Sequence, residues 1–105
     1  MLLPDGTAVG GCNVENASFG LAVCAERNAV AAAVAGGARR FKAVAVVTDL
    51  SPPASPCGAC RQVLAEFGDY PVFLANTSGE CVVTSVAGLL PNAFIGLGLK
   101  QRDEM

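Results

Sequence analysis

Hydrophobic and polar residues alternate along this chain in short blocks that predict helices and strands in turn. Residues 42–47 predict a buried strand, because residues 43–47 form a continuous apolar run. Residues 18–35 carry apolar side chains at helical spacing among many alanines, and Gly36-Gly37 predicts the end of that helix. A second helix is expected over residues 58–67, where the same spacing recurs.

The remaining blocks predict strands and one more short helix. We expect a strand over residues 8–14, after a turn at residues 4–7. Two further strands, residues 71–75 and 81–85, flank a turn, and residues 86–90 predict a short helix before a proline. The order of strand, helix and strand at the start of the chain indicates an α/β domain with parallel pairing.

The amino-acid composition limits which partners and which cellular location are expected for this domain. Only 15% of the 105 residues are charged, compared with about 25% in an average domain, so we expect other subunits to cover part of the surface. The net charge of −2 argues against nucleic acid as a partner. The apolar runs are too short or too interrupted to span a membrane. Five cysteines without a secretion signal favour a reducing, cytoplasmic location.

The spacing of the cysteines indicates a metal site. Cys57 and Cys60 are separated by two residues and can bind one ion, with Cys24 as the third ligand. Three thiolates leave a fourth position open, as in catalytic zinc sites, and the carboxylate of Glu26 would lie beside it. Because Glu26 follows Cys24 by two residues, both can reach one ion only if Cys24 sits at the entry to its helix.

The same residues allow other interpretations. A Cys-x-x-Cys pair also fits a thiol redox module, which would form and break a Cys57–Cys60 disulfide. Cys12 or Cys81 could close a structural site, although we expect both to be small buried hydrophobic residues. The polar segment at residues 13–18 suits hydroxyl recognition, or it satisfies its own backbone as a capped loop.

Three segments of the chain resemble the motifs of cytidine deaminases. The resemblance extends from about residue 2 to residue 94 and implies a three-layer α-β-α fold, with a mixed sheet and helices on both faces. The ligand set is similar to that of the three-cysteine, tetrameric branch of the family. The segments are Asn13-Val14-Glu15-Asn16-Ala17-Ser18, Cys24-Ala25-Glu26 and Pro56-Cys57-Gly58-Ala59-Cys60.

The resemblance assigns a role to each residue of the expected metal centre. The three cysteines of these motifs would hold one zinc ion per chain. Glu26 would carry a proton from the zinc-bound water to the base ring and then to the leaving ammonia. Arg27 and Arg61 would hydrogen-bond the thiolates and compensate their excess negative charge.

The resemblance also implies how a nucleoside would be bound. Asn13 and Glu15 would bind the sugar hydroxyls, and the backbone of Ala25 would hold the pyrimidine edge. Phe19 and Phe94 would lie near the substrate, with Phe94 in the site of a neighbouring subunit of a homotetramer. The implied reaction is hydrolytic deamination of cytidine or deoxycytidine in pyrimidine salvage.

One departure from the family pattern concerns the N-terminus. Family members begin with a helix and a strand that lies between the strands expected at residues 8–14 and 42–47. We therefore expect a single domain, residues 1–105, that is truncated relative to the family. Two alternatives follow: a zinc-binding but inactive subunit, and a deaminase of another small aminopyrimidine nucleoside.

Overall fold

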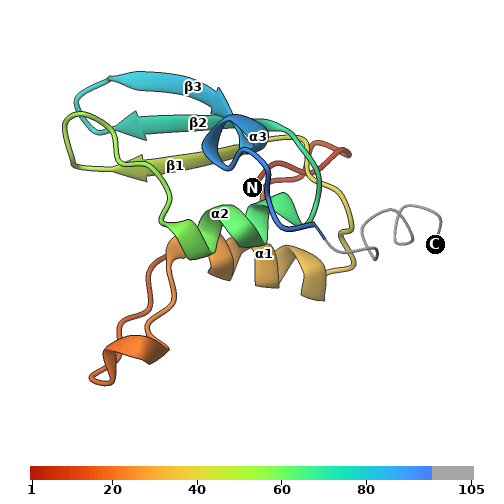
Figure 1. Cartoon of the computed structure of the whole chain (residues 1–105), viewed down its shortest axis with the longest axis horizontal. Coiled ribbons are helices and arrows are strands. Elements are labelled where there is room, and N and C mark those ends of the chain that lie inside the picture. The colour runs from red at the N-terminus through yellow and green to blue at the C-terminus, as the bar shows by residue number, and fades with distance from the viewer. Residues whose placement is uncertain (96–105) are drawn as a thin grey trace.

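A mixed sheet of three strands packs against two helices in the computed structural model, which describes residues 1–95 (Figure 1). One turn of 3-10 helix, η1, precedes the first α-helix. In chain order the elements are η1 (Phe19–Leu21), α1 (Ala25–Ala35), β1 (Val44–Thr48), α2 (Gly58–Ala65), β2 (Pro71–Asn76), β3 (Cys81–Ser85) and α3 (Val86–Leu89).

The sheet has the order β1-β2-β3. β1 and β2 are parallel and are connected through α2, whereas β2 and β3 form an antiparallel hairpin. Side chains alternate between the two faces of each strand, so Val44 and its partner Val72 point the same way. The α/β class with a mixed sheet is therefore as expected, and α1 and α2 lie on one face (Figure 1).

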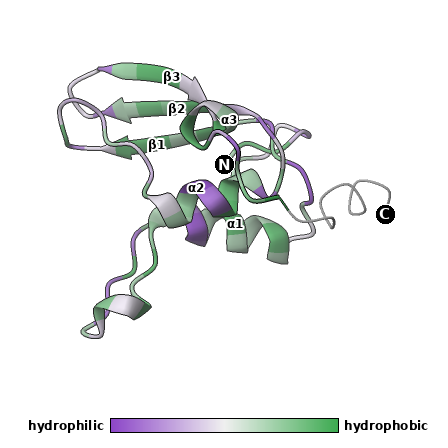
Figure 2. Ribbon diagram, viewed as in Figure 1, coloured by the Kyte–Doolittle hydropathy of each residue, from purple (hydrophilic) through white to green (hydrophobic). Residues whose placement is uncertain are grey.

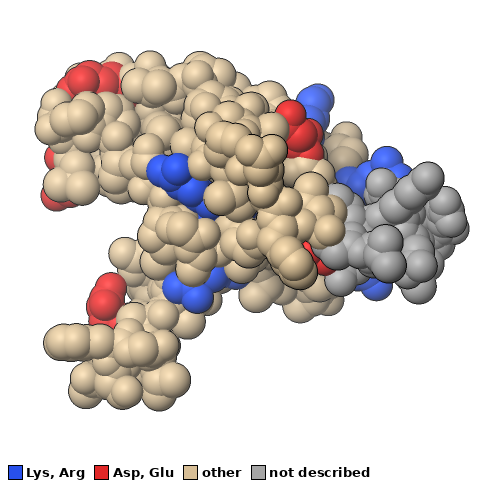
Figure 3. Space-filling view, viewed as in Figure 1, with Lys and Arg blue, Asp and Glu red and all other residues tan. Residues whose placement is uncertain are grey.

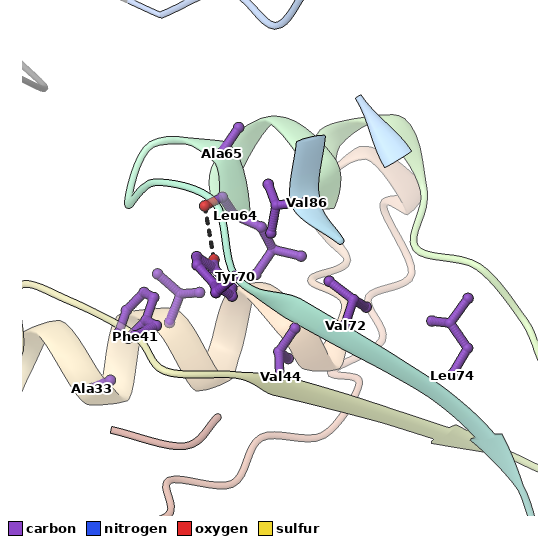
Figure 4. Close-up of a cluster of buried hydrophobic side chains, with 10 residues drawn as sticks. Ala33, Phe41, Val44, Leu64, Ala65, Tyr70, Val72, Leu74 and Val86 are labelled. Carbon is purple, nitrogen blue, oxygen red and sulfur yellow. Dashed lines mark hydrogen bonds between the residues drawn. The ribbon is translucent and has the colours of Figure 1, made fainter. Parts of the chain in front are cut away.

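The hydrophobic core lies between this face and the helices (Figure 4). Leu64 of α2 and Val72 of β2 are almost fully buried, with 1% and 0% of their surface exposed. The Tyr70 hydroxyl donates a hydrogen bond to the Leu64 carbonyl at 2.8 Å, which satisfies the one polar group that this ring brings into the core. The buried members are Val30, Ala33, Phe41, Val44, Leu64, Ala65, Tyr70, Val72, Leu74 and Val86.

The opposite face of the sheet is apolar and exposed. Val47, Phe73 and Val83 lie on it, with 64%, 37% and 62% of their surface exposed. Figure 2 shows hydrophobic residues along all three strands, and Figure 3 shows few charged side chains on the visible surface. Among the described residues, no helix combines the length and hydrophobicity needed to cross a membrane.

Three predictions about the N-terminal third were wrong. Residues 8–14 do not form a strand; Ala8 and Val14 make only isolated bridges. Leu2 instead lies between Ala8 and Ala43 and bridges both in antiparallel orientation, so the parallel pairing predicted for this region does not form. The helix predicted from residue 18 begins only at Ala25, because the preceding segment is extended at Cys24.

The burial of the two cysteines outside the thiol cluster also differs from expectation. Cys12 and Cys81 are both exposed rather than buried. Cys81 opens the edge strand β3 on the same uncovered face as Val83 and Phe73. Cys12 lies in the exposed segment before α1, in which no regular strand forms to bury it.

Candidate active site

The N-termini of α1 and α2 meet at the predicted metal ligands. Cys24 is the N-cap of α1 and Cys57 is the N-cap of α2, and both have extended backbones with ψ of 156° and 168°. Cys60 lies in the first turn of α2 and is buried. The predicted position of Cys24 at the helix entry is therefore confirmed.

The three thiols form a cluster of the size that a zinc ion requires. The Sγ atom of Cys57 lies 3.9 Å from that of Cys24 and 3.4 Å from that of Cys60. All three sulfur atoms lie within 4.8 Å of one another. Tetrahedral zinc with bonds of about 2.3 Å would place its sulfur ligands about 3.8 Å apart. The donor set and its spacing thus fit zinc with one coordination position left open.

The environment of the cluster shifts the pKa values of the Cys57 and Cys60 thiols in opposite directions. Hydrogen bonds with the backbone N–H and with the side chain of Cys60 lower the pKa of the Cys57 thiol. Burial raises the pKa of the Cys60 thiol to about 12, and the neighbouring thiols and Glu26 add to this. Both helix N-termini favour negative charge here, and a divalent cation would favour it further. The cluster is therefore suited to thiolates once a metal ion is present.

Two arginines flank the cluster but make different contacts. The Arg27 Nη2 atom lies 3.7 Å from the Cys24 sulfur, and hydrogen bonds to Cys24 and Cys60 raise the pKa of Arg27. Arg61 donates from Nε to the Pro56 carbonyl and from Nη1 to the Leu89 carbonyl, at 2.8 and 2.7 Å. The structure thus places the Arg27 charge against the thiols, and it links Arg61 to the backbone just before Cys57.

A cleft of about 650 Å³ opens beside the thiols. Its walls come from residues 9–13, from the start of α1 and from β1. Glu26 lines this cleft together with Cys24 and Cys57. A carboxylate beside an open metal position is the arrangement required for proton transfer to a bound substrate.

Residues 11–13 are attached to the first turns of α1. The Asn13 Oδ1 atom accepts the backbone N–H of Ala25 at 2.8 Å, and the Asn28 Nδ2 group donates to the Cys12 carbonyl at 2.7 Å. Sequence reasoning identified Asn13 but missed Asn28, which lies one helical turn after Cys24 and could have been found from that spacing. These contacts place Asn13, a predicted sugar-binding residue, in the wall of the same cleft as Cys24 and Cys57.

Three predicted substrate contacts lie away from this cleft. Glu15 and Phe19 belong to an arm, residues 14–23, that projects from the body of the molecule and is linked at its base by a Val14–Val23 bridge (Figure 1). The Phe19 ring is 90% exposed, and Phe94 is 82% exposed, with its carbonyl held by Gln62 Nε2 at 2.7 Å. Glu15, Phe19 and Phe94 are not among the described residues that line the cleft, so their contacts with a substrate stay predictions.

Comparison with known proteins agrees with this geometry. Residues 1–76 match the family model described as the cytidine and deoxycytidylate deaminase zinc-binding region. Over 96 residues the chain is 54% identical to a cytidine deaminase of Sporosarcina psychrophila, covering 90% of this chain and 71% of that protein. A cytidine deaminase of Halalkalibacterium halodurans is 48% identical, with 90% and 73% covered.

A solved structure supports the same relationship at the level of the fold. The crystal structure of a cytidine deaminase from Burkholderia pseudomallei superimposes with a TM-score of 0.86 at 50% identity. That alignment covers 89% of this chain and 76% of the other. With the family model matched, the sheet reproduced and the three thiols in place, this chain belongs to the cytidine and deoxycytidylate deaminase family.

Proposed function

We propose that this chain catalyses the zinc-dependent hydrolytic deamination of cytidine and deoxycytidine to the uracil nucleosides and ammonia. The observation that carries the proposal is the cluster of three thiols, within 4.8 Å of one another, beside Glu26 in an open cleft. Relatives at 54% and 48% identity are cytidine deaminases, which makes cytidine the first substrate to test.

Cys24, Cys57 and Cys60 would hold the zinc ion, and Arg27 would offset part of their charge. When bound, zinc lowers the pKa of a water molecule so that it can attack near neutral pH. Glu26 would take one proton from the attacking water and deliver it to the ring nitrogen, and it would then pass the second proton, from the hydroxyl group left on C4, to the departing amine. The C4–O bond forms, the C4–N bond breaks, and ammonia leaves.

Asn13 contributes to substrate binding in two ways. Its Oδ1 atom fixes the Ala25 backbone, and its Nδ2 group donates to a sugar hydroxyl. A pyrimidine carbonyl would then share the Ala25 N–H with Asn13 in a three-centre hydrogen bond. Glu15 would accept a hydrogen bond from a second sugar hydroxyl, as the resemblance to the family implies.

We also propose that the active form is a cytoplasmic homotetramer that serves pyrimidine salvage. The support is the exposure of large apolar groups in a chain with few charges, above all Phe19 on the projecting arm and Phe94 near the C-terminal end of the described residues. In this arrangement Phe94 reaches the cleft of a neighbouring copy. Analytical ultracentrifugation would show a species of four chains, and a monomer at micromolar concentration would contradict the proposal.

The decisive experiment combines metal content with turnover. We expect one zinc per chain and loss of the ultraviolet absorbance of cytidine in the presence of the protein. Glu26→Gln should retain zinc and lose at least about 100-fold in turnover, since a positioned acid-base group contributes about 10²–10⁴-fold. Glu66→Gln, a matched change at the C-terminal end of α2, should turn over normally.

Other outcomes would identify which part of the proposal fails. If the wild-type chain binds zinc but does not turn over cytidine, the proposed deaminase activity is wrong and the chain is a metal-binding subunit without activity. A folded, reduced chain without zinc, together with a reversible Cys57–Cys60 disulfide, would support a redox module instead.

A further inference from the structure

Asn76 is a buried polar residue that the proposed mechanism does not use. It ends β2, with 7% of its surface exposed, and its amide makes four hydrogen bonds. The Nδ2 group donates to the Leu50 carbonyl at 3.1 Å and to Glu80 Oε1 at 3.0 Å. The Oδ1 atom accepts the backbone N–H groups of Ser78 at 3.1 Å and Glu80 at 2.9 Å. One side chain therefore joins the β2–β3 turn to a loop 26 residues earlier.

Glu80 makes a second connection to the same loop. Its Oε1 atom accepts a hydrogen bond of 2.6 Å from the Ser51 hydroxyl, in addition to the bond from Asn76. The Thr77 N–H donates to the Thr48 carbonyl at 3.1 Å, at the end of β1. The β2–β3 turn thus holds the start of the loop through both backbone and side-chain contacts.

The far end of this loop is held by α2. Arg61 donates from Nε to the Pro56 carbonyl at 2.8 Å, immediately before the metal ligand Cys57. Residues 52–55 connect the two attachments, and Pro52 and Pro53 restrict the backbone there. Ala54 and Ser55 line the cleft. A short, stiff segment between two fixed points has little freedom, so its attachments determine where this wall of the cleft lies.

We propose that Asn76 and Glu80 are positioning residues that hold residues 49–56 as the wall against which the nucleoside binds. They do not line the cleft, and they act through the backbone of Leu50 and the side chain of Ser51. This inference rests on the proposed deaminase function. It predicts an effect on substrate binding with little effect on zinc, because Cys57 and Cys60 are held by α2 and by the Arg61 contact.

Asn76→Asp removes the hydrogen bond from Asn76 to the Leu50 carbonyl with almost no change in side-chain shape. The aspartate keeps the oxygen that accepts the turn N–H groups, but it cannot donate to Leu50 and it places a like charge against Glu80. We expect KM for cytidine to rise about 10- to 100-fold, since a displacement of about 1 Å remote from the chemistry can cost 10²-fold. The zinc content should stay at one per chain.

Matched variants separate positioning from general stability. Glu80→Ala removes the acceptor and should raise KM, whereas Glu80→Gln retains an acceptor oxygen and should stay within about threefold of wild type. Asp69→Ala removes a comparable bond, from the Ala87 N–H to Asp69 Oδ1 at 2.9 Å, at the opposite end of β2. It should lower Tm without raising KM.

Hydrogen exchange of the Leu50 N–H, which donates to the Thr48 hydroxyl at 3.3 Å, provides a readout independent of turnover. We expect faster exchange in Asn76→Asp and Glu80→Ala and wild-type exchange in Asp69→Ala. Wild-type KM and wild-type exchange in Asn76→Asp would overturn the inference. If the wild-type chain itself does not deaminate cytidine, the proposed function fails, and exchange alone then decides whether Asn76 holds the loop.

Discussion

Replacing Gly11 by alanine should destabilise the protein and disturb the active site together. A Cβ atom at Gly11 would lie 2.5 Å from the Ala25 carbonyl oxygen and 2.5 Å from the Ala29 nitrogen. Ordinary contact begins near 3.4 Å, so both approaches are too close by about 0.9 Å. Both atoms belong to the backbone of α1 and cannot rotate away. The segment at residues 9–13 must therefore move off the helix.

The size of the effect follows from this overlap. Forcing an additional methyl group into a packed contact costs about 1–3 kcal/mol. For a domain of this size, a loss of about 2 kcal/mol lowers Tm by roughly 10 °C. The displacement should also weaken the 2.8 Å hydrogen bond between Asn13 and Ala25, so KM for cytidine should rise.

Thermal unfolding with zinc at saturation, followed by steady-state kinetics, would measure both effects. Gly10→Ala is the matched control, because nothing lies within 4 Å of a Cβ atom at that position. It should remain within about 0.5 kcal/mol of wild type. If Gly11→Ala unfolds at the same temperature as Gly10→Ala, the close approach of this segment to α1 is wrong.

Two further predictions concern charge. Arg27→Ala should weaken zinc retention about 10- to 100-fold in competition with a chelator, because the Arg27 guanidinium offsets the excess negative charge of three thiolates. Arg39 is exposed, so the control variant Arg39→Ala should retain zinc as the wild type does. Equal zinc retention in the two variants would contradict this role of Arg27. Hydrogen bonds from Ser51 and Asn76 hold the pKa of Glu80 below its ordinary value, so their stabilisation should be present above about pH 4.3 and be lost as the pH falls through the folded-state pKa. Chemical unfolding of wild type and Glu80→Gln should therefore converge in acid, and a difference between them that is constant with pH would refute this.

The local features of this protein could be predicted from the sequence. The bounds of β3 and the start of α2 agree with the residue pattern, because a hairpin turn and a run of helix formers are local signals. The position of Cys24 at a helix entry followed from requiring Cys24 and Glu26 to serve one ion. The convergence of three thiols was likewise predictable from motif spacing, since each motif opens a helix.

Apart from the thiol cluster, the contacts between residues distant in sequence were decided by the tertiary structure. Residues 8–14 have a strand-like pattern, but Gly11 packs directly against the backbone of α1 and no regular ladder forms. Asn76 resembled an ordinary turn residue, yet it is buried and bonded to Leu50, 26 residues away. Such pairings depend on how β1 and β2 are aligned in the folded chain. A hydrogen bond between groups of separate elements leaves no periodic pattern in either segment, and so the sequence alone could not show it.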